Sequence, residues 1–270
     1  MVPLIELRGV TITKNDYDVL ANVSLRVQRG RSTVIVGPSG SGKSMLLKVA
    51  GGIMPPDAGQ VLFEGDDLAR LPEQHMLAHR RHYGFAFEDS ALWQNKSIFE
   101  NLALPLQVHS PDLPYPLLEQ RVFELLGTFG LERTSALRPA ELSGGEQKGV
   151  SFLRALLLEP YALLMDEPVL GLDHVLAQRM TDRIRSLKQS GCTMVAVTHD
   201  AGLTSLIADD LVVLRNGAVV ASGPFDEVKT TRDPAVVEIL EHVLGEIMSY
   251  DNELLEMLGG DPARPDRAKS

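Results

Sequence analysis

The chain has 270 residues, of which 44% are hydrophobic and 23% charged, values typical of a folded globular protein. Its net charge of −10 argues against sequence-independent binding to nucleic acid, which needs clustered lysines and arginines. One cysteine excludes an internal disulfide, and no apolar run approaches the ~20 residues that span a bilayer. The N-terminus lacks the pattern of a signal peptide. We therefore expect a cytoplasmic protein that meets the membrane only through a partner.

Short apolar runs near both ends of the chain predict β-strands. They are residues 4–10, 23–27, 33–36, 61–63, 162–165, 193–198, 211–214 and 218–221. A helical stretch separates the fifth run from the sixth, which is typical of parallel strands joined by helical crossovers. The last two runs flank Asn216-Gly217, a dipeptide that favours a hairpin. The alternation predicts an α/β fold.

The middle of the chain, about residues 70–140, has the periodicity of helices. Apolar residues recur there at helical spacing, namely Leu117, Leu118, Val122, Leu125, Leu126 and Phe129. Four prolines predict a broken loop in front of that helix: Pro105, Pro111, Pro114 and Pro116.

A second helical pattern follows Asp233-Pro234, a dipeptide that favours a helix start. This C-terminal extension, residues 233–258, either packs on its own domain or docks on the opposite subunit or a small accessory protein. The last stretch, residues 259–270, is polar with two prolines, and we expect it to be a frayed tail.

A glycine-rich motif follows the run at 33–36 and fits a phosphate-binding loop. Its residues are Gly37, Pro38, Ser39, Gly40, Ser41, Gly42, Lys43 and Ser44. The glycines let backbone N–H groups point at phosphate oxygens, and the helix that follows adds the positive end of its dipole. Lys43 would reach the β- and γ-phosphates, while the Ser44 hydroxyl can ligate Mg²⁺. The motif alone predicts only a nucleoside triphosphate site.

The apolar run at 162–165 ends in two carboxylates, Asp166 and Glu167. A buried strand would deliver Asp166 to the sheet edge beside the phosphate loop, where it can hold Mg²⁺ directly or through water. Glu167 could orient or deprotonate an attacking water. Alone, the pair could be a solvated acidic turn, but the upstream phosphate loop favours the functional interpretation.

A third motif, Leu142-Ser143-Gly144-Gly145-Glu146, lies between the other two. Ser143 and Glu146 form a capping box, which by itself indicates only a helix start. Two consecutive glycines are costly inside a first helical turn. Close approach of a phosphate to the backbone would explain them.

With these motifs in this order, residues 4–225 resemble the ATP-binding cassette (ABC) family, whose signature is Leu-Ser-Gly-Gly-Gln. The resemblance implies a P-loop NTPase cassette over residues 1–232. It has a RecA-like core, an N-terminal antiparallel β subdomain and an inserted α-helical subdomain at about residues 88–155. It also implies a head-to-tail dimer in which each ATP lies between the phosphate loop of one copy and the signature of the other.

The same resemblance implies further site residues. Ser143, Gly144 and Gly145 would touch the γ-phosphate of ATP held by the other subunit. His199 occupies the switch-histidine position that contacts the γ-phosphate, and Asp173 the D-loop position that links the two sites.

Some positions depart from the family pattern. Glu88 replaces the glutamine that senses Mg²⁺ and the membrane partner; a carboxylate can still ligate Mg²⁺ but adds negative charge beside the phosphates. The aromatic that stacks on adenine falls at Lys14, and Tyr17 is the nearest alternative. Glu146 ends the signature in place of glutamine, and Gly149 replaces an arginine common in the following helix.

Three segments resemble the Mla/Mkl-type ATPases, which power phospholipid transport by MCE proteins across the bacterial envelope: residues 97–106, 167–173 and 233–236. This likeness implies a permease partner, an MCE-domain protein, a small accessory subunit and a place on the inner face of the cell membrane.

Other functions compete with phospholipid transport. The chain could serve a lipoprotein-release or other permease, or be a nucleotide-gated module with weak hydrolysis. An ABC ATPase acting on nucleic acid or ribosomes is disfavoured by the acidic charge. The sequence specifies neither the cargo nor the direction of transport.

Overall fold

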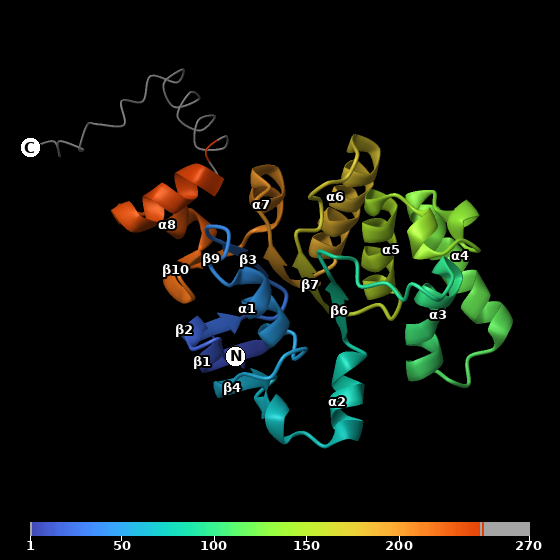
Figure 1. The fold of residues 1–270 in the computed structure, drawn as a ribbon, viewed down its shortest axis with the longest axis horizontal. Helices are drawn as coiled ribbons and strands as arrows, with labels where there is room; N and C mark the ends of the chain where they lie inside the picture. Colours follow the sequence, from blue (N-terminus) through green and yellow to red (C-terminus); the bar gives the residue numbers. More distant parts are fainter. Residues whose placement is uncertain (1, 244, 246–270) are drawn as a thin grey trace, which may run out of the picture.

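The computed structural model describes residues 2–243 and residue 245, and it places two β-sheets on either side of a central helix (Figure 1). The smaller sheet is antiparallel, with strand order β2-β1-β4-β5. Its strands are β1 (Ile5–Lys14), β2 (Tyr17–Val27), β4 (Ala58–Phe63) and β5 (Asp66–Asp67). The first two are joined by a tight turn at Asn15 and Asp16, which both have positive φ.

The larger sheet has six strands in the order β10-β9-β3-β8-β7-β6. They are β3 (Ser32–Val36), β6 (Tyr83–Ala86), β7 (Ala162–Asp166), β8 (Thr193–Val197), β9 (Asp210–Arg215) and β10 (Ala218–Pro224). All neighbours pair in parallel except β10, which forms an antiparallel hairpin with β9. Every residue of β3, β7 and β8 is buried, as expected for parallel strands covered on both faces.

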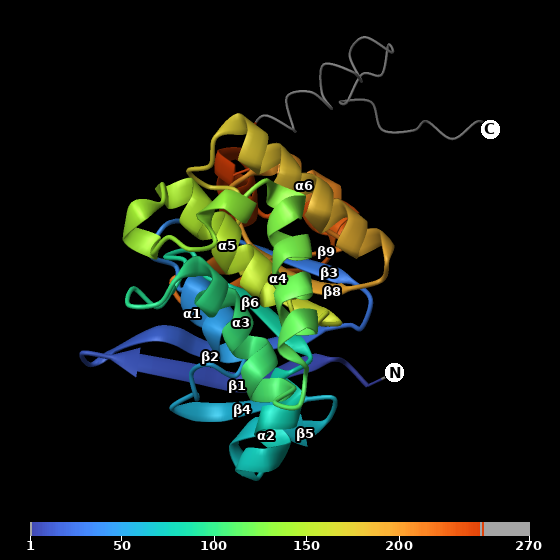
Figure 2. The same cartoon turned by 90° about the vertical axis from the view of Figure 1, so that its right-hand side faces the viewer.

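Helices cover the larger sheet, and two of them also contact the antiparallel sheet (Figures 1 and 2). They are α1 (Lys43–Ala50), α2 (Glu73–Arg80), α3 (Ile98–His109), α4 (Tyr115–Phe129), α5 (Gly144–Leu156), α6 (His174–Gln189), α7 (Ala201–Ile207) and α8 (Phe225–Lys229). Short 3₁₀ turns occur at Leu68–Arg70, Glu132–Thr134 and Pro139–Glu141.

The apolar core consists of two clusters, one on each face of the six-stranded sheet. In β3, Ile35 joins the cluster that contains α1 and the antiparallel sheet, whereas Val34 and Val36 join the cluster under α3 to α7. Because side chains alternate along a strand, each strand of this sheet contributes to both clusters. The sequence-based α/β cassette fold, with its antiparallel β subdomain, is therefore confirmed.

The predicted strands are all present, but two details of the middle segment were wrong. The helical interpretation of residues 70–140 missed β6, a strand of only four residues. Pro105 lies inside α3 and Pro116 in the first turn of α4, not in a broken loop. Pro116 fits because N–H groups in a first turn have no helical partner. In α3, a Ser97–Glu100 capping box and the buried Leu102 and Leu106 stabilise the helix despite the internal proline.

The described part of the C-terminal extension packs on this chain. Residues 234–243 are helical, and Val236, Ile239, Leu240 and Val243 belong to the larger core cluster. The predictions for residues 246–258 and for the tail at 259–270 lie outside the described residues. None of the helices within residues 2–243 and 245 combines the length and hydropathy required to cross a bilayer.

Candidate functional site

The predicted phosphate loop connects β3 to α1 at the carboxyl end of the parallel strands. Gly42 caps α1 with a φ of 98°, and a Cβ there would lie 2.7 Å from the carbonyl oxygen of Val19, so only glycine fits. The Lys43 ammonium folds back and donates to the carbonyls of Gly37 (2.8 Å) and Pro38 (2.9 Å). Burial lowers the pKa of Lys43, against the opposite effect of the carboxylates of Glu167, Asp166 and Glu88. The loop thus holds a positive charge at its centre.

One polar group in the loop has no protein partner. Ser41 is 4% exposed, and its hydroxyl makes no hydrogen bond within the part of the chain that the structure describes. Buried hydroxyls are normally satisfied, so an unpaired one beside exposed Ser39 and Gly40 fits a loop that receives an anionic ligand.

Asp166 ends β7 beside this loop. The Ser44 hydroxyl donates to Oδ1 of Asp166 at 3.0 Å, which joins the first turn of α1 to the neighbouring strand. Burial raises the pKa of Asp166, the bond from Ser44 lowers it, and the charge of Glu88 raises it further. A hydroxyl and a carboxylate in contact supply the hard oxygen ligands that Mg²⁺ prefers.

Glu167 follows Asp166 in a left-handed conformation, with φ 46°. Its carboxylate accepts a hydrogen bond from the backbone N–H of His199 at 3.2 Å and lies 3.5 Å from the His199 Nε2. Burial raises the pKa of Glu167 to about 7, although the His199 hydrogen bond and the charge of Lys43 lower it. Burial lowers the pKa of His199, and the charges of Lys43 and His242 add to this effect. A carboxyl group poised near neutrality suits a general base.

Glu88 lies two residues beyond β6 and is exposed. It is close enough for its charge to raise the pKa of Asp166, Glu167 and Lys43. The structure therefore places Glu88 in the electrostatic environment of the other site residues, without a direct contact to them.

The signature motif begins α5. Ser143 is the N-cap, and its hydroxyl accepts a hydrogen bond from Glu146 N. The Ser143 N–H in turn donates to the Glu146 carboxylate, which completes the predicted capping box. Ser143 and Gly144 are exposed, and a Cβ on Gly144 would meet nothing within 4 Å. No contact within the described chain thus explains the glycine at 144. Gly145 packs against Leu172.

The structure also shows the surroundings of the remaining residues that the sequence singled out. Asp173 caps α6 by accepting from Leu176 N at 3.0 Å. Lys14 and Tyr17 pair across the β1–β2 turn and both are exposed, so the geometry does not select between them for adenine. Gly149 lies among Phe129, Leu131 and Leu176, where an arginine would have to displace apolar side chains.

Lys148 is a residue that the sequence analysis missed. Its ammonium donates to the carbonyl oxygens of Glu167 (3.0 Å) and Leu170 (2.7 Å). A lysine in the second turn of an amphipathic helix is usually a solvated one. The one signal in the sequence is its position, five residues after Ser143 and shortly after the signature motif.

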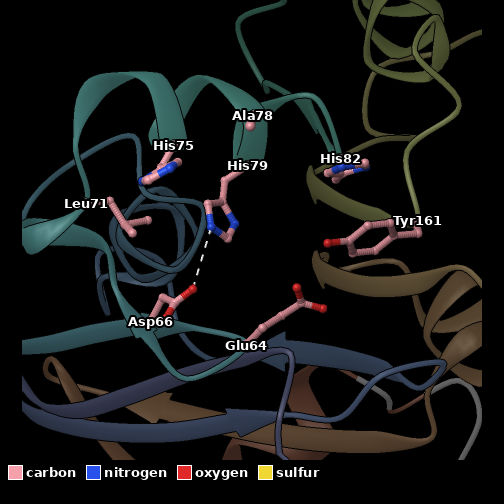
Figure 3. Close-up of a pocket in the computed structure, with 8 residues that line it drawn as sticks. All are labelled: Glu64, Asp66, Leu71, His75, Ala78, His79, His82 and Tyr161. Carbon is pink, nitrogen blue, oxygen red and sulfur yellow. Dashed lines mark ion pairs between the residues drawn. The ribbon is translucent and has the colours of Figure 1, made fainter.

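A separate cavity of about 410 Å³ lies at the opposite, amino-terminal edge of the parallel strands (Figure 3). His75 and His79 of α2 line it, and His79 faces Asp66 at 3.9 Å. His82 stacks on Tyr161 on the other side. Within residues 2–243 and 245, no three His, Cys, Asp or Glu side chains are grouped to hold a metal ion. This cavity is not part of the phosphate site.

Comparison with known proteins defines the class to which this fold and site belong. The family model described as ABC transporter matches residues 20–170, and the chain belongs to this family as an ATP-binding subunit. It is an ATPase that hydrolyses ATP for transport.

The chain is similar to particular members. It is 34% identical to the intermembrane phospholipid transport system ATP-binding protein MlaF of Escherichia coli K12, over 89% of both chains. It is 33% identical to the spermidine/putrescine import ATP-binding protein PotA of Pasteurella multocida, over 84% of this chain and 60% of PotA. Among solved structures, it resembles the dimeric post-hydrolysis state of the ATP-binding cassette MJ0796 bound to ADP and Pi. The TM-score is 0.75 and the identity 29%, over 82% of this chain and 98% of that one.

Proposed function

We infer that two copies of this chain form an ATP-sandwich dimer that powers a phospholipid transporter from the cytoplasmic face of a membrane. The nucleotide site rests on one observation, that two contacts and one charge lie at the same edge of the sheet. Ser44 bonds to Asp166, His199 bonds to Glu167, and the charge of Lys43 acts on both carboxylates. Lys43, Asp166 and Glu167 are buried, which strengthens their electrostatic effect on a phosphate.

Each side chain then has a distinct role. Lys43 leaves the carbonyls of Gly37 and Pro38 to bind the β- and γ-phosphates, helped by the unpaired Ser41 hydroxyl. Ser44 and Asp166 would hold Mg²⁺, which would neutralise phosphate charge. Glu167 takes the proton of the attacking water, and His199 lies beside it to contact the γ-phosphate.

The second copy completes the site. Ser143, Gly144 and Gly145 form an exposed helix N-terminus without a Cβ at the two glycine positions, which suits close approach of a phosphate held by the partner. Asp173 lies at the start of α6 to link the two sites. Hydrolysis and phosphate release weaken this bridge, and the resulting opening moves the permease.

Two variants test the nucleotide chemistry. Lys43→Ala removes the central positive charge, so the affinity for a fluorescent ATP analogue should fall at least about tenfold. Glu167→Gln keeps the phosphate contacts but lacks the base, so ATP turnover should fall by roughly 10²–10⁴-fold while the analogue still binds. Turnover equal to the parent in Glu167→Gln would refute the role of Glu167, and unchanged nucleotide affinity in Lys43→Ala would refute that of Lys43.

Glu88 supports a second candidate, a nucleotide-gated module with weak hydrolysis. Its exposed carboxylate adds negative charge next to the phosphate site. Steady ATP turnover by the assembled complex would exclude this candidate. Turnover that rises strongly in Glu88→Gln would show that the native carboxylate restrains hydrolysis.

The phospholipid cargo rests on the likeness to MlaF, which extends over nearly the whole of both chains. The similar identity to PotA makes polyamine import the alternative. Affinity purification from native membranes, followed by mass spectrometry, separates them. Recovery of a permease with an MCE-domain protein and a small accessory subunit supports phospholipid transport. Recovery of a different permease would refute the proposal of phospholipid cargo. Recovery of ribosomes or nucleic acid without a permease would refute the proposal that the chain powers transport.

A further inference from the structure

Lys148 connects the helix that carries the signature to the turn that carries Glu167. It lies on α5, five residues after Ser143, and its ammonium bridges the carbonyl oxygens of Glu167 and Leu170 at 3.0 and 2.7 Å. Both acceptors belong to the segment between β7 and α6. The side chain therefore joins two elements that are separated in the sequence by about 20 residues.

Besides Lys148, the hydrogen bond from His199 N to the Glu167 carboxylate and backbone bonds hold this segment. Glu167 adopts a φ of 46°, a conformation that L-residues adopt at an energetic cost and keep only when their surroundings impose it. Its N–H donates to Val197 O at 2.9 Å, and its carbonyl accepts from Leu170 N at 3.4 Å, a long bond. The short bond from Lys148 to Leu170 O thus closes a turn whose own hydrogen bond is weak.

The charge of Lys148 also suits this position. Burial lowers the pKa of Lys148, while the negative charges of Glu88, Glu167 and Asp166 raise it. An ammonium is the natural counterion to three carboxylates, and hydrogen bonds from a charged donor are stronger than neutral ones.

We propose that Lys148 is a positioning residue for ATP hydrolysis, which fixes the Glu167–Leu170 turn against the signature helix and so holds the Glu167 carboxylate in place. The proposal rests on the proposed function, in which Glu167 is the base. The same helix presents Ser143 and Gly144 at its exposed end. A shift of this helix when the signature binds the partner's nucleotide would therefore be transmitted to Glu167 through Lys148. Both contacts of the Lys148 ammonium are to backbone carbonyls of this turn, so we expect it to act on the rate through the position of Glu167.

The test compares three lysine variants by ATP turnover, KM, binding of a fluorescent ATP analogue and thermal melting. Lys148→Met keeps the length and removes the donors, and Lys148→Arg keeps donors and charge. Lys188→Met is the matched control, because Lys188 also donates to a backbone carbonyl, that of Ile207 at 2.7 Å, at the far end of α6.

We expect kcat to fall roughly ten- to a hundredfold in Lys148→Met with KM and analogue affinity within about twofold. Lys148→Arg should recover most of the rate, and Lys188→Met should match the parent.

The outcomes separate this proposal from the one it depends on. Loss of turnover in Glu167→Gln together with parental kcat in Lys148→Met overturns the role of Lys148 alone. Parental turnover in Glu167→Gln overturns the role of Glu167 itself. A rise in KM without a change in kcat, or a failure of arginine to restore the rate, also contradicts positioning through hydrogen bonds. If Lys148→Met does not fold, Lys148→Gln takes its place, and parental kcat there overturns the proposal.

Discussion

The buried carboxyl group of Glu167 lowers the free energy of unfolding when it is ionised. The residue is 6% exposed, its backbone is left-handed, and burial raises its pKa from the ordinary 4.5 to about 7. A carboxyl group whose pKa is raised on folding binds its proton more tightly in the folded state. Stability is therefore lost as the pH rises from about 4.5 to about 7, and the penalty stays constant above that range.

Glu167→Gln should therefore stabilise the nucleotide-free protein at high pH. Glutamine keeps an oxygen to accept the bond from His199 N but has no charge to desolvate. We expect a gain of about 2 kcal/mol in the free energy of unfolding at pH 8, which shrinks as the pH falls toward 5. Urea denaturation in EDTA at both pH values measures it. A variant less stable than the parent at pH 8 would show that Glu167 is not held at an energetic cost.

Sequence alone located most residues that the structure brings together at the site, because the motifs are contiguous and follow buried strands. Ser44 and Asp166 lie in contact, and Lys43 lies close enough for its charge to interact with Asp166, as their order along the chain predicted. Lys148 could not be found in this way, since its role depends on a contact with carbonyls about 20 residues away. The choice between Lys14 and Tyr17 remains a prediction, because both are exposed on the same turn.

Among the helices, α5 begins with a glycine, Gly144, that the fold of one copy does not require. Glycine is costly in a helix, and a Cβ on Gly144 would meet nothing within the described chain. A side chain there is therefore tolerated by the fold of one copy, but in the proposed dimer it would obstruct the partner's nucleotide.

Gly144→Val should accordingly melt within a few degrees of the parent and bind the ATP analogue normally, while ATP turnover falls at least about tenfold. Gly127→Val is the control, since Gly127 is an exposed helical glycine on α4 next to a flexible Glu132 side chain. It should retain turnover. Parental turnover in Gly144→Val would exclude the signature from the nucleotide site.

The strands were predicted more reliably than the elements of the middle segment. Apolar runs such as those of β3, β7 and β8 are buried on both faces, and their composition reports this directly. Strand β6 is short, and its place beside β7 is set by pairing with a distant segment. The intrinsic helix propensity of proline is low, which is why the sequence placed Pro105 in a loop. Burial of the apolar side chains of α3 outweighs that propensity and keeps the segment helical.

At the scale of the molecule, the described C-terminal helix is part of the core of its own copy. Leu240 is 1% exposed, and Glu238 pairs with Arg215 at the end of β9 at 3.6 Å. Pro38 of the phosphate loop lines a cavity with Ile239 and His242, so this helix lies next to the nucleotide site.

Leu240→Ala should cost about 2–5 kcal/mol of stability in a single copy, because it opens a cavity in the main core. Glu241→Ala, an exposed neighbour on the same helix, should change stability by less than about 0.5 kcal/mol. Denaturation at low protein concentration measures both. Equal stability of the two variants would mean that this helix serves a partner and not its own domain.

The most direct test of the account is the mass of Glu167→Gln in solution, measured by light scattering with and without ATP and Mg²⁺. One copy has a mass of 29.5 kDa. If ATP bridges the phosphate loop of one copy and the signature of another, saturating ATP should double this mass and the added Gly144→Val substitution should prevent the change. A mass that ATP does not alter, or a dimer that forms equally well with valine at position 144, would contradict the nucleotide-sandwich motor.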